Sequence, residues 1–183
     1  MSDVIHLHVG QAGCAIGADL IQQHDSKLST FKPIFVDCEP RVVAKLPSTI
    51  PKIHGLSGAS TNWALGSSQS SLISSTIDTL RRSAESLDWL GSFCITSSIT
   101  GGTGGGLLSG ILSHPDFPVN VDCNVVVPFG KDNTTPLHSF SSTLSMYYIN
   151  DLVDNFLFLT MIFCLTRTLG KEEVTWISKQ GQL

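Results

Sequence analysis

Charged side chains are scarce in this chain of 183 residues. Lys, Arg, Asp and Glu together make up 14% of it, and 11 basic against 15 acidic residues give a formal net charge of −4. The chain lacks the basic surplus with which proteins neutralise nucleic-acid phosphates, so we predict no nucleic-acid partner. The low charge, together with a mean hydropathy of +0.20, indicates a well-buried sheet or a surface that a partner covers.

Long apolar runs and paired cysteines are also missing. The longest apolar stretch, residues 156–165, is interrupted by Thr160, and it has about half the length that a membrane span needs, so we predict no membrane association. The start of the sequence is polar and acidic, unlike a signal peptide. The widely spaced cysteines form no CxxC pair or Cys/His cluster, which argues against zinc and favours a reducing, intracellular setting. They are Cys14, Cys38, Cys94, Cys123 and Cys164.

Glycine, in contrast, is concentrated in one segment. Residues 100–106 read Thr-Gly-Gly-Thr-Gly-Gly-Gly and directly follow an apolar, strand-like run. Five glycines in seven positions lose too much backbone entropy on folding for a plain turn. Without Cβ atoms, backbone N–H groups can converge on an anion, and a helix predicted over residues 107–112 favours negative charge at its start. We predict a phosphate-binding loop. The alternative, a flexible linker, seldom lies between a buried strand and a helix.

Strand-like and helix-like segments alternate along the chain. The patterns predict strands over residues 4–9, 34–36, 93–96, 125–127 and 156–159, and helices over 11–24, 40–46, 67–89, 107–112 and 137–151, with a loop over 47–61. This alternation predicts an α/β fold, a Rossmann-like three-layer arrangement with a parallel sheet covered on both faces. We expect residues 1–165 to form this domain. Residues 166–183 show no periodicity and are expected to form an irregular C-terminal tail.

The predicted loops after the strands would meet at one edge of the sheet, where open α/β folds bind ligands. Four of them carry glycines or polar residues, at 10–13, 37–39, 100–106 and 130–135. One interpretation is a dinucleotide-binding oxidoreductase, because glycines open a helix after the first strand and an acid follows the second. The glycine spacing does not match GxGxxG, however, and this interpretation leaves residues 100–106 without a role. No GxxxxGK[ST] motif is present.

Four motifs, in order, resemble those of the tubulin superfamily. Residues 8–13 (HVGQAG) resemble the first nucleotide loop, residues 35–40 (FVDCEP) the acidic second loop, residues 57–66 the third, and residues 101–106 (GGTGGG) the signature GGTGSG with its serine replaced. The resemblance spans about residues 3–160 and implies a fold of the tubulin N-terminal GTPase-domain type, with GTP and Mg²⁺ as cofactors. Details of the motifs look more like gamma, delta and epsilon tubulins than alpha or beta, although residues 8–13 lean towards alpha.

The resemblance also implies a set of nucleotide-binding residues and no catalytic residue within the chain. Gln11, Asp37 and Glu39 would act on Mg²⁺ or its waters, and Asn62 would hydrogen-bond a γ-phosphate. Each has a structural alternative: Gln11 as an exposed residue at a helix start, Glu39 as an acid that complements a helix dipole, and Asn62 as a loop cap. The full set of predicted cofactor-binding residues is Gly10, Gln11, Ala12, Asp37, Glu39, Asn62, Gly101, Gly102, Thr103, Gly104 and Gly105.

Departures from the family pattern qualify the function that the resemblance implies. Ala15, His138 and Met161 stand near positions where the family carries polar groups for the base and ribose, which predicts weakened or lost guanine selectivity. The catalytic acid of tubulins comes from the C-terminal half of the next subunit, and that half is absent from this sequence. We therefore expect GTP binding without efficient hydrolysis by this chain alone.

We expect a GTP-binding tubulin-like cytoskeletal protein. Its expected partners are other tubulin subunits or microtubule and centriole proteins. Its expected location is the cytoplasm and cytoskeleton, and the centrosome or basal body if it belongs to the gamma, delta and epsilon group. The alternatives are a Rossmann-type NAD(P)-binding oxidoreductase and a degenerate tubulin fragment that binds no nucleotide.

Overall fold

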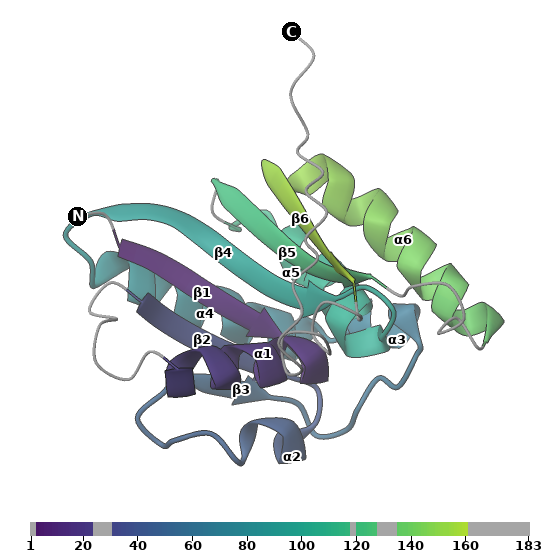
Figure 1. The fold of residues 1–183 in the computed structure, drawn as a ribbon, viewed down its shortest axis with the longest axis horizontal. Coiled ribbons are helices and arrows are strands. Elements are labelled where there is room, and N and C mark those ends of the chain that lie inside the picture. Colours follow the sequence, from purple (N-terminus) through teal and green to yellow (C-terminus); the bar gives the residue numbers. More distant parts are fainter. Residues whose placement is uncertain (1–2, 24–30, 118–119, 128–134, 161–183) are drawn as a thin grey trace, which may run out of the picture.

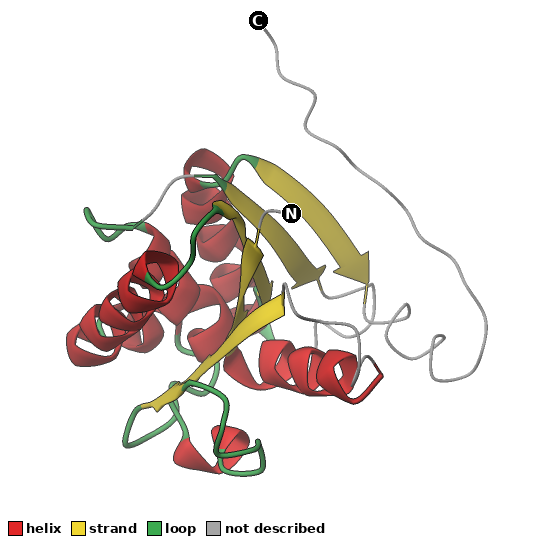
Figure 2. Cartoon of the chain, turned by 90° about the vertical axis from the view of Figure 1, so that its left-hand side faces the viewer, coloured by secondary structure: helices red, strands yellow, loops and turns green. Residues whose placement is uncertain are grey.

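A computed structural model of the chain describes residues 3–23, 31–117, 120–127 and 135–160, which form a six-stranded sheet with helices on both faces (Figures 1 and 2). The strands are β1 (Asp3–Val9), β2 (Phe31–Asp37), β3 (Lys52–His54), β4 (Leu90–Ser98), β5 (Val121–Val127) and β6 (Asn155–Thr160). They lie in the order β3-β2-β1-β4-β5-β6, and every neighbouring pair is parallel. The predicted α/β architecture with a parallel sheet is confirmed.

Two layers of helices cover the sheet. The helices are α1 (Gly10–Gln23), α2 (Pro40–Val43), α3 (Trp63–Ser67), α4 (Ser70–Glu85), α5 (Leu108–Leu112) and α6 (Pro136–Leu152), with a π-helix, η1 (Gly102–Leu107), directly before α5. The chain first adds β2 and β3 on one side of β1 and then adds β4, β5 and β6 on its other side. Because crossovers between parallel strands are right-handed, this change of direction places α1 and α2 on one face of the sheet and the later helices on the other. In Figure 1, α1 and α2 lie in front of the sheet and α4 and α5 behind it.

The larger part of the core lies on the α4 side of the sheet. Ile5 and Leu7 of β1 and Ile95 of β4 are fully buried there, in one cluster with the inner face of α4. That face is apolar at helical spacing, at Leu72, Ile73, Ile77 and Leu80. A smaller cluster around Phe35 lies under α1 and α2. Burial of alternate strand side chains on opposite faces holds the sheet between the two layers.

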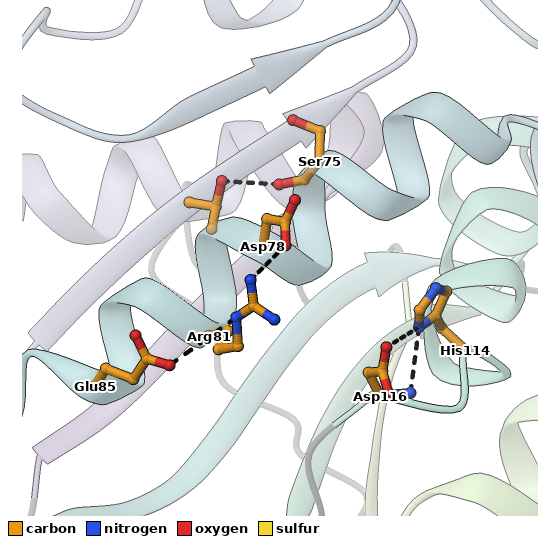
Figure 3. Close-up of polar contacts among 7 residues, drawn as sticks. Ser75, Asp78, Arg81, Glu85, His114 and Asp116 are labelled. Atoms are coloured by element: carbon orange, nitrogen blue, oxygen red, sulfur yellow. Dashed lines mark hydrogen bonds and ion pairs between the residues drawn. The ribbon is translucent and has the colours of Figure 1, made fainter.

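The outer face of α4 carries the charges that its inner face lacks. Arg81 lies between Asp78, at 2.9 Å, and Glu85, at 4.0 Å (Figure 3). All three side chains are exposed, so these ion pairs contribute little to stability. In the turn that follows α5 along the chain, the backbone N–H of Asp116 donates to the imidazole Nδ1 of His114 at 3.2 Å (Figure 3).

Two short elements were not predicted, and one helix is shorter than expected. The predicted loop over residues 47–61 contains β3, and α3 was missed altogether. Strand β3 has three residues, too few to show alternation, and it forms because β2 offers a free edge: the N–H of Gly55 donates to the carbonyl of Asp37 at 3.0 Å. The predicted helix over 67–89 runs only from Ser70 to Glu85, since Leu90 already belongs to β4.

Helix α6 faces the core with two serines, Ser141 and Ser145, and with Ile149, all of which are buried. The inward hydroxyls are satisfied by backbone carbonyls: Ser141 Oγ donates to Thr61 O at 2.7 Å, and Ser145 Oγ to Ser141 O at 2.6 Å. Three other large apolar side chains of the helix point outward: Leu137, Phe140 and Tyr147 are 57%, 69% and 69% exposed. Such an outer face is typical of one that another surface covers.

Among the described residues, no helix combines the length and the apolar character needed to cross a bilayer.

Candidate functional site

A pocket of about 460 Å³ opens at the carboxyl edge of the sheet, where β1, β2 and β4 end. Figure 1 shows the arrowhead of β1 leading directly into α1 at this edge. In a parallel α/β sheet the ligand site is expected at this edge, near the point where the strand order reverses. The pocket is lined by Val9, Gly10, Gln11, Ala12, Ala15, Asp37, Glu39, Val42, Ala59, Ser60, Ser98, Thr100, Gly101, Thr103 and Gly104.

Close approach of two glycine-containing segments forms one side of the pocket. Gly10, at the junction of β1 and α1, has a φ of +75°, a conformation that L side chains rarely adopt. A Cβ atom on Gly10 would lie 3.1 Å from both the Cα and the N of Gly104. The two residues therefore meet backbone to backbone. A ligand in this part of the pocket meets main-chain atoms rather than side chains.

The glycine-rich segment is mostly helical, which corrects the prediction of a loop followed by a helix from residue 107. The π-helix begins at Gly102 and continues into α5. Its glycines are required by packing, since a Cβ on Gly104 would overlap the carbonyl of Ser98 and one on Gly106 the carbonyl of Trp63. Short π-helical turns within helices are frequent at functional sites.

The first turn of this π-helix supplies hydrogen-bond donors. A helix start leaves its first N–H groups without acceptors inside the helix. The N–H of Gly102 donates to the carbonyl of Ser60 at 2.8 Å, which ties down the loop before α3. Thr103 and Gly104, the next two residues, both line the pocket. Their N–H groups are the donors that the helix start offers to an anion.

Asp37 and Glu39 form the acidic side of the pocket. Asp37 is 3% exposed, its Oδ1 accepts the N–H of Glu39 at 2.7 Å, and desolvation by burial raises the pKa of its carboxyl group to about 6. Glu39 accepts a hydrogen bond from Arg41 at 3.0 Å and packs so closely on Gly58 that a Cβ there would overlap its Oε1. A buried carboxylate that must be ionised near neutral pH is best stabilised by a cation.

In the part of the chain that the structure describes, the pocket lining contains these two carboxylates and no Lys or Arg. Among the described residues, no group of three or more His, Cys, Asp or Glu side chains could hold a metal ion. Mg²⁺ needs no such group, because it keeps several waters and is commonly bound by one or two carboxylates together with phosphate oxygens. The donor set of Asp37, Glu39 and the amide of Gln11 at the same pocket therefore fits Mg²⁺ that a phosphate ligand shares.

The family model for the GTPase domain of the Tubulin/FtsZ family matches residues 3–160. The chain belongs to the Tubulin/FtsZ family. The matched range covers all six strands of this tubulin/FtsZ domain and the whole pocket. The order of strands and the glycine segment after β4 are accounted for by this family, and the dinucleotide-oxidoreductase alternative is not favoured.

Curated relatives are tubulin beta chains. That of Encephalitozoon cuniculi (strain GB-M1) is 42% identical over 108 residues, which cover 56% of this chain and 24% of the relative. Those of Schizophyllum commune and Porphyra purpurea are both 28% identical, over 198 and 210 residues, covering 85% and 90% of this chain and 44% of each relative. The chain thus spans less than half the length of these relatives. Membership of the gamma, delta and epsilon group is not confirmed.

Most of the residues predicted for this tubulin/FtsZ site lie together in the pocket. Asn62, Gly102 and Gly105 do not line it. Asn62 Oδ1 accepts the N–H of Leu65 at 3.2 Å and caps α3, which is the contact expected if Asn62 serves as a cap. Those that line the pocket are Gly10, Gln11, Ala12, Asp37, Glu39, Gly101, Thr103 and Gly104. The nucleotide-binding role of each remains a prediction, and segment 130–135 lies outside the described residues except for Thr135.

Two hydroxyl-bearing residues of the pocket, Ser98 and Ser60, were not predicted as ligand contacts. Ser98, at the end of β4, shares a hydrogen bond between hydroxyls at 2.9 Å with Thr100, the first residue of the predicted phosphate-binding loop. The place of Ser98 directly before that loop was a signal that could have found it. Ser60 lines the pocket with a φ of +49°, unusual for a residue other than glycine. Nothing in the residues around it indicated this conformation.

Two aromatic side chains have unusual surroundings. His8, on β1, is fully buried with neither ring nitrogen hydrogen-bonded to any described residue, and it stacks on Phe35 with ring centroids 4.9 Å apart. Trp89 is 73% exposed, whereas Trp63 stacks on Tyr148 with ring centroids 5.0 Å apart.

Proposed function

We propose that this chain binds GTP together with Mg²⁺ in the pocket at the carboxyl ends of β1, β2 and β4. The observation that carries the proposal is the backbone contact between Gly10 and Gly104, next to a buried carboxylate, in a chain of the tubulin/FtsZ GTPase family. The N–H groups of Thr103 and Gly104 would donate to phosphate oxygens. Gly10, Gln11, Ala12 and Gly101 would border the phosphate chain.

The metal ion is essential to this proposal because of charge. The part of the pocket that the structure describes brings Asp37 and Glu39 together without a basic side chain, so these two carboxylates would repel a triphosphate on its own. Mg²⁺ would neutralise the phosphates, with Asp37, Glu39 and the Gln11 amide holding it directly or through its waters. Glu39 is already paired with Arg41 at 3.0 Å, whereas Asp37 Oδ1 accepts a backbone N–H, so we take Asp37 as the main ligand.

The experiment is a titration of the purified 183-residue chain with GTP, with Mg²⁺ and again with EDTA, after any co-purified nucleotide has been extracted and identified. The matched control is Arg81→Ala, on the outer face of α4 and away from the pocket. We expect one GTP per chain for both proteins, with binding lost in EDTA. Absence of binding by a folded chain would contradict the proposal and favour a degenerate fragment.

We propose further that the chain turns over GTP slowly on its own. The proposal assigns both acids of the described pocket lining to Mg²⁺, and Glu39 is also paired with Arg41, which leaves neither as the base that activates a water. Hydrolysis would then need a group from a second protein. Single-turnover measurements with the chain alone and with added tubulin would test this, and rapid turnover by the chain alone would contradict it.

We also propose that the chain associates with other tubulin subunits as part of the cytoskeleton, in the cytoplasm and at the centrosome or basal body. The outward apolar face of α6 supports a partner, because Phe140 and Tyr147 are largely exposed and no charged side chain occurs between Thr135 and Asn150. We expect the chain to co-elute with tubulin, and we expect the double variant Phe140→Ser, Tyr147→Ser to elute separately from it. Equal co-elution of the parent and the variant would show that the outer face of α6 is not the binding surface. A tagged chain that does not localise to the cytoskeleton would contradict the proposed location.

A further inference from the structure

The pocket has two chemically different sides. The side formed by η1 and the ends of the strands carries backbone N–H groups and the hydroxyls of Ser98, Thr100 and Thr103. Among the described residues, the side formed by the neighbouring helices α1 and α2 carries Ala12, Ala15 and Val42. These three side chains contain no hydrogen-bonding atom.

A nucleotide whose phosphates lie at η1 has its base directed away from the phosphate chain. Ala12 and Ala15 are three residues apart, on one face of α1, and Val42 comes from α2 on the same side of the sheet. Such a wall offers any base the same apolar contact. Apolar sites separate similar ligands by only about 10- to 200-fold, whereas sites built to hydrogen-bond a polar group reach about 10⁴- to 10⁵-fold.

The one acidic side chain that follows β2 towards this wall does not change this conclusion. A carboxylate can recognise the adjacent N–H groups of guanine, and Glu39 lies only three residues before Val42. Its Oε2, however, accepts a hydrogen bond from Arg41 at 3.0 Å, and its Oε1 packs against Gly58. In the proposed function this carboxylate also holds Mg²⁺, which places it on the phosphate side of the pocket. Gln11, the polar residue of α1 in the pocket, directly follows Gly10 and belongs to the phosphate side.

We propose that the pocket recognises the Mg²⁺-bound triphosphate chain and does not select the base. This inference rests on the proposed function, since it assumes that the pocket holds a nucleotide. The ligand class is then any nucleoside 5′-triphosphate, with inorganic tripolyphosphate as the smallest member. GTP would bind through the same phosphate contacts as ATP or CTP.

The test is a set of calorimetric titrations of the 183-residue chain, freed of bound nucleotide, with the Mg²⁺ complexes of GTP, ATP, CTP and tripolyphosphate. We expect the three nucleotides to bind with dissociation constants within about tenfold of one another. A preference for GTP above about 100-fold would overturn the inference and leave the proposed function standing. Failure of all four ligands to bind would remove both.

A pair of variants locates the wall. Ala15→Gln places an amide on it, whereas Ala44→Gln places one on an exposed residue beyond α2 that does not line the pocket. We expect Ala15→Gln to change the ratio of GTP to ATP affinity at least fivefold while tripolyphosphate binding stays the same, and Ala44→Gln to change neither. An unchanged ratio in Ala15→Gln would show that the base lies elsewhere and overturn this assignment.

Discussion

Gly10 and Gly104 meet backbone to backbone, so closely that a Cβ on Gly10 would come within 3.1 Å of the Cα and N of Gly104. This contact joins the end of β1 to the first turn of η1. The contact and a φ of +75° require glycine at position 10, whereas Gly104 is required by the carbonyl of Ser98, which a Cβ there would overlap. Both residues line the pocket, so their contact forms part of its wall.

Gly10→Ala is expected to lower the free energy of unfolding by about 1–3 kcal/mol, because alanine is strained at positive φ and its Cβ has no room. The control is Gly101→Ala in the same pocket. A Cβ on Gly101 would meet nothing closer than 3.9 Å, so that variant should stay within about 0.5 kcal/mol of the parent. Denaturant unfolding measures both. Equal effects of the two substitutions would contradict this account of the glycines.

A second packing relationship links Gly105 to α6. A Cβ on Gly105 would overlap the hydroxyl of Ser145, which is buried and donates to Ser141 O and Ile99 O. Gly105→Ala should therefore destabilise the fold by about 1–3 kcal/mol through overpacking. Adding Ser145→Gly should recover part of the loss. Recovery should be incomplete, since the carbonyl of Ile99 lies 2.8 Å from the same Cβ. A double-mutant cycle with no coupling would show that the two residues do not share this space.

His8 makes stability depend on pH. Burial lowers the pKa of its imidazole from 6.5 to about 3, and the pKa of the neighbouring His6 falls to about 4 for the same reason. Between these values and 6.5 the unfolded chain binds more protons than the folded chain, so these histidines lower stability as the pH falls below about 6.5. His8→Phe keeps the stacking on Phe35 and removes both unpaired nitrogens.

We expect His8→Phe to be more stable than the parent by about 1 kcal/mol at pH 7, where the unpaired polar atoms alone are removed, and by a growing margin towards pH 4. Chemical denaturation of both proteins across this range gives the difference. The comparison is needed because Asp37, whose pKa is raised, acts in the opposite direction between about pH 4 and 6. A difference that does not change with pH would mean that His8 is not held neutral.

Asp37 is expected to control the pH dependence of Mg²⁺-nucleotide binding. Its carboxyl group has a pKa of about 6 in the folded chain, and only the ionised form can hold a cation. Below pH 6 the affinity for Mg²⁺-GTP should therefore fall roughly tenfold per pH unit, and above pH 7 it should level off. Asp37→Asn should bind weakly with a flat profile. A parent profile that is already flat from pH 5 to 8 would exclude Asp37 as the metal ligand.

The sequence was sufficient for five of the six strands of the sheet and for most of the described pocket lining. Strong apolar runs such as Val125–Val127 and the four glycine-containing or acidic motifs predicted the strands and the edge at which the loops meet. The short elements were lost because they depend on neighbours: β3 exists because β2 has a free edge, and α3 is held by its Asn62 cap and by contact with η1. No periodicity appears in three to five residues.

The glycine-rich segment shows a different limit. Its composition predicted an open loop, whereas the structure has a π-helix whose glycines fit against the backbones of Ser98 and Trp63. Glycine's helix-breaking cost is outweighed by close packing that sequence alone does not reveal. The glycines of the segment therefore fall into two groups: Gly101 and Gly104 line the pocket, whereas Gly102 and Gly105 do not. The division at residue 165 stays a prediction, since residues 161–183 lie outside those described.

The most direct test of the central claim is to observe where Mg²⁺-GTP touches the chain. Backbone amide resonances of the ¹⁵N-labelled protein would be followed during titration with Mg²⁺-GTP. We predict saturable shifts at Gly10, Gln11, Thr103 and Gly104, and none at Arg81 and Glu85 on the outer face of α4. Shifts confined to other parts of the molecule, or no shifts at saturating nucleotide, would contradict the claim that this pocket holds the phosphate chain.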